Sequence, residues 1–456
     1  MTSFHQTVKK LAEQIESRMI ADRRDFHRYA EAGWTEFRTA SLVARRLTDL
    51  GYQVSLGRDV LADAERMGLP DETDLEAHYQ RAVAQGGDPA FLPALRGGFT
   101  GVVGTLKNGK GPTLGMRFEM DALDIPESGA PDHRPQREGF ASVNPGVMHA
   151  CGHDAHTAVG LGIAQVLSRV QEDWQGTLKL IFQPAEEGVR GAKAMTAAGV
   201  VDDVDLLVDF HFFSGWATDE ITPGMDGFSA TRKFDVFFYG QPSHAGGSPQ
   251  AGKNALLAAA TAVLNLYAIP RHSSGHTRIN VGKLSAGSGR NIIPAEAHLV
   301  METRGENTAL SEYMFAQAQR VLHAAAEMYD CRLEIRPMGA AQSASSDRAL
   351  SKRVEAAARE AGDFHILPTC KSGGSEDVTY MMQRVQKNGG LAVSVGLGAD
   401  ISGIRSTDME NNDQVLRAHT PKYDIHEGTL KKAVVLFSML AGQCLGAEEN
   451  NFDKTE

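Results

Sequence analysis

One eleven-residue stretch, MHACGHDAHTA from Met148 to Ala158, holds three histidines, one cysteine and one aspartate. Imidazoles, a thiolate and carboxylates are the ligands that borderline divalent ions such as Zn²⁺, Mn²⁺ and Co²⁺ take in proteins. The same residues also fit the polar start of a helix, and Cys151 taken alone is most often a small, inert apolar residue. The stretch therefore indicates a metal site only in combination with further ligands from elsewhere in the chain.

Further candidate ligands follow short apolar runs. The run TLKLIFQ is followed by PAEEG, which contains Glu186 and Glu187, and the run VDLLVDF is followed by His211. His419, in RAHTPKYD, lies in a predicted loop before the last helix. Adjacent side chains point in different directions, so one carboxylate of the pair can hold a metal while the other removes a proton from bound water. Each residue alone has an ordinary structural explanation, but their joint occurrence at strand ends favours a metal-dependent hydrolytic site.

The composition describes a globular protein and argues against two kinds of partner. A chain of 456 residues is long for one core, which predicts two domains. Its net charge is -11 and it has no basic block, whereas nucleic acids and anionic membranes both attract a basic surface, so neither is expected as a partner. We find no apolar run long enough for a signal peptide or membrane span, and no CxxC spacing among the four cysteines. These features predict a cytoplasmic protein.

The periodicity of apolar residues predicts an α/β sheet. We expect a helix over 39–50 that stops at Gly51, a hairpin around Asn108-Gly109, and an insertion of mixed helix and loop over 59–98. A strand over 177–182 and a second one near His211 flank a helix over 158–170, which leaves Cys151 and His153 in the preceding loop. In α/β sheets, ligands bind at the carboxyl ends of the strands.

A different order of elements runs from about 228 to 339. It consists of strand 234–239, helix 254–268, strands 277–284 and 295–304, helix 310–329 and strand 332–336. This β-α-β-β-α-β order is that of a ferredoxin-like unit. We therefore predict a catalytic α/β domain over 1–225 and 342–456, with a second domain inserted over 226–341.

The chain resembles a family of dinuclear-metal amidohydrolases that contains hippurate hydrolase, plant auxin-conjugate hydrolases and p-aminobenzoyl-glutamate hydrolase. The resemblance covers nearly the whole chain and rests on motifs in the family's order: RRDFHRYAEAGWTEFRTA, MHACGHDAHTA, IFQPAEEG, GQPSHAG, GSGRNIIPAEA and GGSEDVTYMM. It implies a mixed-sheet catalytic domain with an inserted lid and dimerisation domain. It also implies two divalent metal ions, either Mn²⁺ or Zn²⁺, with Co²⁺ as a further option.

The resemblance assigns roles to individual residues. The implied metal ligands are Cys151, His153, Glu187, His211 and His419. Glu186 would be the general base, Asp121 a catalytic-site carboxylate behind the ligands, and Asp154 would orient a ligand histidine. Two departures stand out: Glu119 occupies a position where the family usually has aspartate, and a long polar segment precedes His419, which leaves His426 as the alternative last ligand.

Other implied roles belong to the inserted domain and to one loop. His244 and Asn291 would donate hydrogen bonds to the scissile carbonyl as negative charge develops on it. Arg304 would bind the carboxylate of the substrate with its guanidinium fork. Gly373, Gly374 and Ser375 would form a tight loop beside the site.

The expected reaction is hydrolysis of the amide bond of an N-acyl amino acid, with p-aminobenzoyl-glutamate as the expected substrate. One alternative is another conjugate, such as indole-3-acetyl-aspartate. A second alternative, from a different class, is a mainly structural subunit of a hetero-oligomeric amidohydrolase. The implied protein partner is a second copy or a related chain, bound through the lid as a homodimer or heterodimer.

Overall fold

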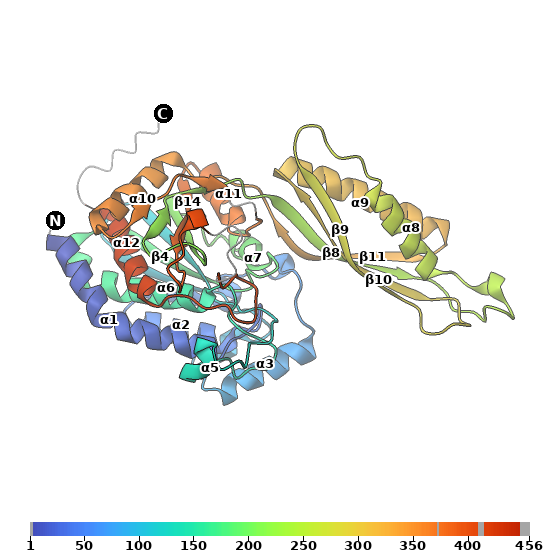
Figure 1. Ribbon diagram of the computed structural model, residues 1–456, viewed down its shortest axis with the longest axis horizontal. Coiled ribbons are helices and arrows are strands. Elements are labelled where there is room, and N and C mark those ends of the chain that lie inside the picture. Colours follow the sequence, from blue (N-terminus) through green and yellow to red (C-terminus); the bar gives the residue numbers. More distant parts are fainter. Residues whose placement is uncertain (1–2, 372–373, 409–414, 447–456) are drawn as a thin grey trace.

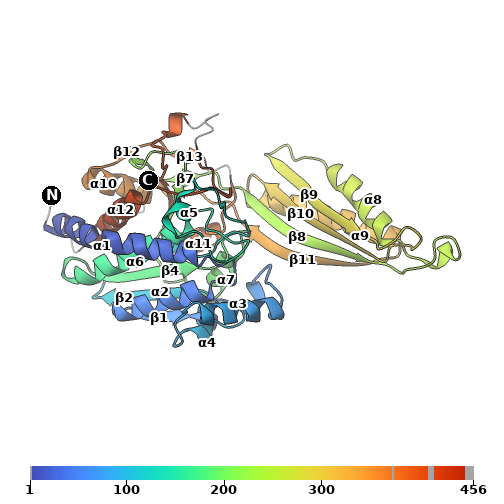
Figure 2. The same cartoon turned by 60° about the horizontal axis from the view of Figure 1, so that its bottom comes forward.

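The chain folds into a large body and a smaller, elongated one that projects from it (Figure 1). The computed structural model describes residues 3–371, 374–408 and 415–446. The large body contains both ends of the described chain, and the small body is formed by one continuous segment between them (Figure 2). Gly373 of the predicted tight loop lies outside the described residues.

An eight-stranded mixed sheet forms the centre of the large body. In spatial order its strands are β1 (Gln53–Leu56), β2 (Val102–Asn108), β4 (Gly176–Gln183), β3 (Thr113–Glu119), β5 (Leu206–Phe213), β14 (Leu391–Gly398), β6 (Glu220–Thr222) and β12 (His365–Ile366). The neighbours β4, β3, β5 and β14 are parallel to one another, whereas β2 and β6 run antiparallel to the strands beside them. A separate two-stranded ladder joins β7 (Met225–Asp226) to β13 (Cys370–Lys371). The predicted α/β class with a mixed sheet is confirmed.

The hairpin predicted around Asn108-Gly109 is wrong. The chain does turn there, with Gly109 at a φ of +75°, but β4 lies between β2 and β3 and pairs with both. The side chain of Asn108 instead donates hydrogen bonds to the carbonyls of Gln171 and Trp174, which lead into β4. A turn signal identifies a reversal of the chain but not the strand that fills the space between its two arms.

Helices cover both faces of this sheet. Alternate residues of a strand point to opposite faces, and the buried residues of β5 follow this rule: Leu206 and Val208 belong to one apolar cluster and Leu207 to another. The helices that share the first cluster or pack against it are α1 (Ser3–Arg28), α2 (Phe37–Asp49), α3 (Glu72–Ala84), α4 (Leu92–Leu95), α6 (His153–Arg169), α10 (Arg348–Ala361) and α12 (Gly428–Leu445). The second cluster contains α7 (Gly191–Ala197) and α11 (Thr379–Lys387), and the short α5 (Arg134–Glu138) lies beside the loops. None of the described helices is both long and apolar enough to cross a membrane.

The small body has the predicted ferredoxin-like order. It consists of β8 (Ala230–Tyr239), α8 (Ala255–Tyr267), β9 (Thr277–Ala286), β10 (Glu296–Gly305), α9 (Thr308–Met328) and β11 (Arg332–Ala341). Its antiparallel sheet has the order β11-β8-β10-β9, and both helices pack on one face around a separate apolar core. We call this unit the lid. Its bounds at 226 and 341, and its part in dimerisation, stay predictions.

The lid is attached directly to the loop that follows β4. The backbone N–H of Ala340, at the end of β11, donates a 2.9 Å hydrogen bond to the carbonyl of Val189. Gly339 packs so closely on the same loop that a Cβ added to it would lie 2.0 Å from the carbonyl oxygen of Gly188. Only glycine fits at position 339 without displacing this loop.

Candidate active site

The parallel strands bring several predicted site residues to one edge of the sheet. Glu119 is the last residue of β3, the Glu186-Glu187 pair follows β4, and His211 lies near the carboxyl end of β5. Because β4, β3 and β5 are consecutive parallel strands, their carboxyl ends meet at the same edge. This placement is the one predicted for ligands of an α/β sheet.

The MHACGHDAHTA stretch forms the start of α6. Gly152 precedes the helix with a φ of +92°, and His153 is the first helical residue, so the prediction that His153 lies in the loop before the helix is wrong. Its Nδ1–H donates a 2.9 Å hydrogen bond to the carbonyl of Asp121. Its other nitrogen, Nε2, is buried and has no hydrogen-bond partner among the described residues. The ring is therefore held at one nitrogen, and the other nitrogen is directed into the site.

Asp121 organises the loop that contains the glutamate pair. Its carboxylate accepts hydrogen bonds from the backbone N–H groups of Glu186 (3.1 Å) and Glu187 (2.9 Å), and one of its oxygens lies 3.3 Å from Nδ1 of His153. The same loop contains Ala185 and Val189, both with positive φ angles (50° and 61°). Asp121 thus positions both glutamates and His153, as expected of a carboxylate behind the ligands.

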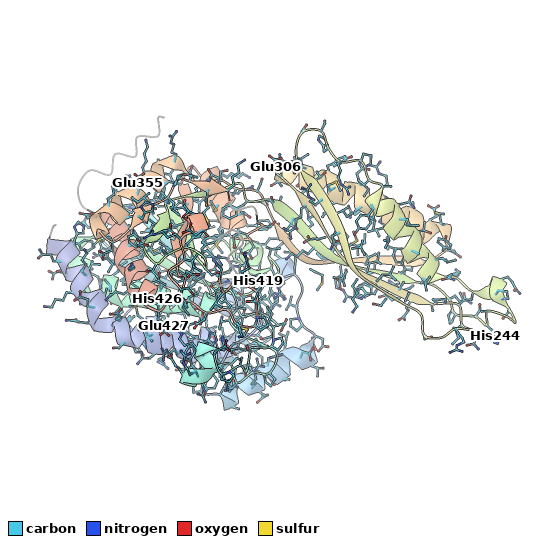
Figure 3. The ribbon with its side chains drawn as sticks, viewed as in Figure 1. His244, Glu306, Glu355, His419, His426 and Glu427 are labelled. Carbon is cyan, nitrogen blue, oxygen red and sulfur yellow. The ribbon has the colours of Figure 1, made fainter. Side chains whose placement is uncertain are left out.

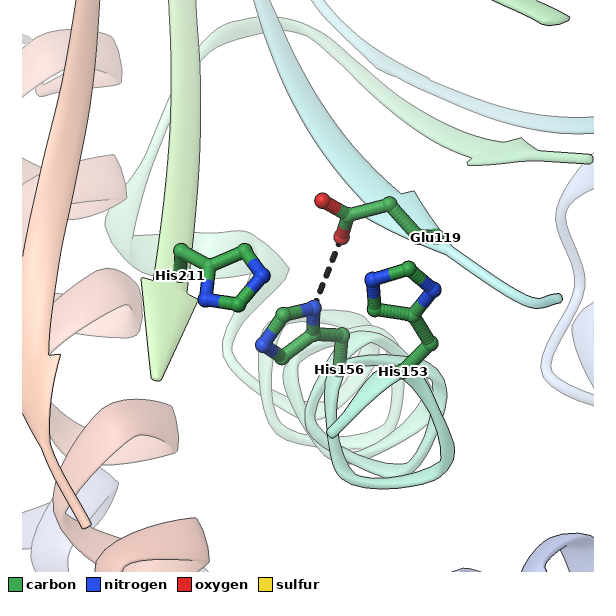
Figure 4. A group of neighbouring side chains, drawn as sticks. All are labelled: Glu119, His153, His156 and His211. Atoms are coloured by element: carbon green, nitrogen blue, oxygen red, sulfur yellow. Dashed lines mark hydrogen bonds and ion pairs between the residues drawn. The ribbon is translucent and has the colours of Figure 1, made fainter. Parts of the chain in front are cut away.

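His211 and Cys151 face each other across the site. Nδ1–H of His211 donates to the carbonyl of Phe212 (2.8 Å), and its Nε2 lies 3.4 Å from Sγ of Cys151. Figure 4 shows His211 and His153 on either side of His156. As in His153, the backbone fixes one ring nitrogen of His211 and leaves Nε2 for another partner.

His419 lies at the same site, whereas the alternative ligand His426 does not. The backbone of His419 has a φ of 63°, its N–H donates to the carbonyl of Ala150 (2.8 Å), and its Nε2 is 3.3 Å from Oε1 of Glu187. His426 is exposed, and its Nδ1 accepts a hydrogen bond from the backbone N–H of Gly428. The two histidines are labelled at separate positions in Figure 3.

The chemistry of this cluster suits divalent cations. Ligand atoms within 4.8 Å of one another occur in the overlapping groups Cys151, Glu187 and His419; His153, Glu186 and Glu187; and Glu119, His153, His156 and His211. Burial, with the nearby carboxylates of Glu187 and Glu186, raises the pKa of the Cys151 thiol well above its usual value. Burial lowers the pKa of His153, but hydrogen bonding to Asp121 and the charge of Glu119 outweigh it and raise that pKa to about 10. A divalent cation favours the deprotonated forms of both side chains, because it competes with their protons and offsets the excess negative charge.

Glu186 has the most unfavourable environment for a carboxylate in the cluster. Its Oε2 lies 3.8 Å from Nε2 of His153. Burial, together with the carboxylates of Glu376 and Glu187, raises the pKa of Glu186 well above that of a free glutamate. A carboxylate with a raised pKa is a more effective proton acceptor near neutral pH.

Two further histidines of the opening stretch have no free nitrogen or no contact with the ligand set. His156 donates from Nδ1 to Oε2 of Glu119 (2.7 Å), the bond drawn in Figure 4, and its Nε2 accepts from the backbone N–H of Phe212 (3.2 Å). His149 is buried with neither ring nitrogen bonded within the described part of the chain, and burial lowers its pKa to about 3. His156 therefore supports the site through Glu119, and His149 is a neutral core residue.

Behind the site lies a buried arginine that sequence reasoning missed. Arg117, on β3, is fully buried; Nε donates to Gln183 (2.9 Å). Its two terminal nitrogens contact four carboxylates, those of Glu119, Asp209 (3.1 Å), Glu376 (3.1 Å) and Asp377 (3.0 Å). Burial raises the pKa of Asp209 to about 8 and that of Asp377 to about 7, although Arg117 lowers both. We call these five ionisable residues the Arg117 cluster. A charged residue in the middle of the apolar strand TLGMRFE was the signal that pointed to it.

A second ionic group fixes the start of α6 from outside. Asp154 accepts from Nε of Arg23 (2.8 Å) and from Nδ1 of His27 (2.8 Å), both on α1, rather than from a predicted ligand histidine as expected. Nε2 of His27 donates to Glu127 (3.0 Å). Burial lowers the pKa of His27, but these two carboxylates outweigh it and raise that pKa to about 9. Because both partners only accept hydrogen bonds, His27 binds them as an imidazolium.

The structure does not bring the predicted lid residues to the cluster within one chain. His244 lies at the far tip of the lid, well separated from His419 (Figure 3). Asn291 is beside it, because its carbonyl accepts from the N–H of Ala245 (3.0 Å). Arg304 is near the opposite end of β10, where Nε and one terminal nitrogen donate to both oxygens of Glu302 (2.8 and 3.1 Å).

A mixed α/β sheet with clustered thiol, imidazole and carboxylate groups at its carboxyl edge, and with an inserted ferredoxin-like lid, defines a metal-dependent hydrolase of amide bonds. The sequence profile described as Peptidase family M20/M25/M40 matches residues 115–437. The chain belongs to this family and is a metal-dependent amidohydrolase.

Known relatives agree with this assignment over most of their length. The chain is 50% identical over 408 residues to indole-3-acetyl-aspartic acid hydrolase of Enterobacter agglomerans, which covers 89% of this chain and 94% of that protein. It is 48% identical over 420 residues to one of the named subunits of p-aminobenzoyl-glutamate hydrolase of Escherichia coli, with 91% and 95% covered. The crystal structure of aminobenzoyl-glutamate utilization protein from Klebsiella pneumoniae superimposes with a TM-score of 0.82 at 43% identity, covering 96% of this chain and 98% of that one.

Proposed function

We propose that the protein hydrolyses the amide bond of N-acyl amino acids with two divalent metal ions, and that p-aminobenzoyl-glutamate is its substrate. The observation that carries the proposal is the pair of histidines His153 and His211, each with Nδ1 bound to a backbone carbonyl and Nε2 directed into one buried cluster. Such anchoring of the second nitrogen is characteristic of metal-binding histidines. Two relatives of nearly equal identity are named for p-aminobenzoyl-glutamate and for indole-3-acetyl-aspartate, which keeps the second conjugate as the alternative substrate.

The proposed metal ligands are the five predicted from the sequence. They are Cys151, His153, Glu187, His211 and His419. His419 is preferred to His426 because its imidazole lies beside Glu187, whereas that of His426 caps the start of α12. Thiolate, imidazole and carboxylate ligands suit Zn²⁺, Mn²⁺ or Co²⁺. Bound divalent ions would lower the pKa of water and polarise the scissile carbonyl.

Glu186 is the proposed general base. Asp121 holds the backbone of both glutamates, so the side chain of Glu186 keeps its position next to the ligands without having to be one. Its raised pKa suits it to accept a proton from the attacking water and then to donate it to the leaving nitrogen of the amino acid. The role of Asp121 is to keep this loop and His153 in register.

The lid is the proposed dimerisation surface. Leu257 (44% exposed), Leu264 (75%) and Tyr267 (47%) form an apolar stripe on α8, and the neighbouring β9 is an edge strand of the lid sheet. Exposed apolar stripes beside an open strand edge favour pairing with a second chain. A partner docked there is either a second copy or a related chain, and the Escherichia coli relative, which is named as one subunit of its enzyme, is compatible with the latter.

Pairing through the lid also explains the position of His244. Its Nδ1 accepts from the N–H groups of Gly246 (3.1 Å) and Gly247 (2.9 Å), which leaves Nε2–H as an outward donor at the tip. We propose that His244 and Asn291 serve the active site of the neighbouring protomer, where they donate to the developing oxyanion. Arg304 would bind the substrate carboxylate in exchange for its present partner, Glu302.

The test is hydrolysis by the purified chain. The protein is loaded with Mn²⁺ or Zn²⁺ and supplied with p-aminobenzoyl-glutamate, indole-3-acetyl-aspartate and other N-acyl glutamates and aspartates, and release of the free amino acid is measured. We expect release from p-aminobenzoyl-glutamate, its loss in Glu186→Gln, and no change in Glu172→Gln, a control on an exposed glutamate. A metal-loaded protein that releases no amino acid from any conjugate would contradict the proposal and support a mainly structural role in a hetero-oligomer.

A further inference from the structure

A small cavity opens beside His211, on the side of the site that faces the start of the lid. Its volume is about 140 Å³. The lining residues are Asp209, His211, Phe213, Met225, Phe228, Ser375, Glu376 and Ser394. One end is therefore formed by a proposed metal ligand, the walls by two aromatic rings and a methionine, and the remainder by carboxylates and hydroxyls.

The apolar walls are fixed by their own contacts. Phe213 stacks on Trp216 with ring centroids 4.7 Å apart and packs against Gly396, where an added Cβ would lie 3.2 Å from its ring. Met225 is buried, and its carbonyl accepts from Oγ of Ser346 (2.7 Å). Phe228 is buried as well. The size of the cavity is thus set before any ligand binds.

This size matches one six-membered aromatic ring. An apolar protein cavity of about 150 Å³ is known to bind benzene, so a single phenyl ring fits the volume beside His211. A fused two-ring system such as indole exceeds it. Since His211 closes one end, a ring bonded to the scissile carbonyl can enter the cavity while the carbonyl stays at the ligand cluster.

The polar residues of the cavity need a hydrogen-bond donor. Oγ of Ser375 is buried and has no hydrogen-bond partner among the described residues. Glu376 uses Oε1 to accept from Arg117 (3.1 Å), and Asp209 already accepts from both Arg117 and Ser394. A hydroxyl and a carboxylate side by side suit a ligand that donates two hydrogens, because carboxylates can only accept.

We propose that this cavity is the acyl subsite and that it selects a single-ring aroyl group with a hydrogen-bond donor at its far end, recognised by Ser375 and Glu376. An aromatic amine is such a donor. The inference rests on the proposed function and narrows it, because it favours p-aminobenzoyl over benzoyl, which lacks the donor, and over indole-3-acetyl, which has two fused rings.

The experiment compares three glutamate conjugates, with p-aminobenzoyl, benzoyl and indole-3-acetyl as acyl groups. For the wild type we expect kcat/KM to be at least about tenfold higher for p-aminobenzoyl than for benzoyl, the usual range for a lost hydrogen bond to a built site. Ser375→Ala should reduce that ratio towards one, whereas Ser17→Ala, a control on the exposed face of α1, should leave it unchanged. Met225→Ala, which widens the cavity, should raise indole-3-acetyl relative to p-aminobenzoyl by about tenfold.

A second measurement separates this inference from the proposed function. The metal-loaded protein is titrated calorimetrically with p-aminobenzoate and with benzoate, which needs no turnover. We expect tighter binding of p-aminobenzoate in the wild type and nearly equal binding in Ser375→Ala, with both proteins unfolding at the same temperature. Equal kcat/KM for p-aminobenzoyl and benzoyl conjugates, or equal binding of the two acids to the wild type, would overturn the subsite while leaving the hydrolase intact. If no conjugate is hydrolysed, the proposed function fails, and the two titrations still decide the subsite.

Discussion

Replacement of Arg117 by methionine should destabilise the protein strongly, because it removes the cation from the Arg117 cluster and leaves the carboxylates buried. The side chain is 0% exposed and contacts four carboxylates as well as Gln183. Loss of one partner from a buried ion pair costs about 3–5 kcal/mol. The pKa of Asp209 is about 8 and that of Asp377 about 7, so these two are partly protonated at neutral pH and need the cation less. We therefore expect a loss near the lower end of the range, about 3 kcal/mol.

The assay is urea unfolding of the wild type and three variants. Arg117→Lys keeps the charge but loses the planar fork, so it should recover only part of the loss. Arg96→Met is the matched control: Arg96 is 60% exposed and pairs with Glu76 at the surface, where an ion pair contributes less than about 1 kcal/mol. Towards acidic pH the deficit of Arg117→Met should shrink, because neutral carboxyl groups need no cation. A deficit no larger than that of Arg96→Met, or one that grows as the pH falls, would refute the reasoning.

Three further predictions concern the base, the lid and the pH dependence of stability. Glu186→Gln should retain metal and lose turnover by about 10²–10⁴-fold, whereas Glu187→Gln should also lose metal; equal metal content in the two variants would contradict the assigned roles. Arg304→Ala should lower kcat/KM on an acyl-glutamate by about ten- to a hundred-fold, Arg304→Lys should recover part of it, and the loss should be smaller on the α-amide; an identical loss on both substrates would show that the arginine is structural. The pKa of His27 is raised from 6.5 to about 9 in the folded protein, so its stabilisation is complete below pH 6.5 and is lost as the pH rises to 9. Relative to His27→Gln, the wild type should lose about 3 kcal/mol of unfolding free energy over that interval, and a difference independent of pH would contradict this assignment.

The parts of the structure that depend on local patterns could be predicted from the sequence. The alternation of apolar residues in β8, β9, β10 and β11 and the helical periodicity between them identified the ferredoxin-like lid. The glycine after α2 identified its end, since Gly51 has a φ of +86°. The stretch from Met148 was informative because several ligand types stand close together, and its residues do lie beside Glu187 and His211.

The parts that depend on distant pairing could not be predicted. The turn at Asn108-Gly109 indicates a hairpin, but β4 comes from a later part of the chain and separates its two strands. Arg117 was visible as a charge in an apolar strand, yet its partners Asp209, Glu376 and Asp377 come from two other elements. The position of His244 at the tip of the lid follows from the length and direction of β8 and not from the motif in which it occurs.

The contact between Gly339 and Gly188 has a mechanical consequence. Since the end of β11 is bonded to Val189 and packed on Gly188, a rotation of the lid about this point exerts a torque on the loop that presents Glu186 and Glu187. Lid and loop therefore move as a linked pair, and the angle of the lid sets the aim of the two carboxylates. A chimaera that takes its lid from a relative with any larger residue at position 339 would show its defect in the catalytic loop, because a Cβ 2.0 Å from the carbonyl oxygen of Gly188 must displace that loop.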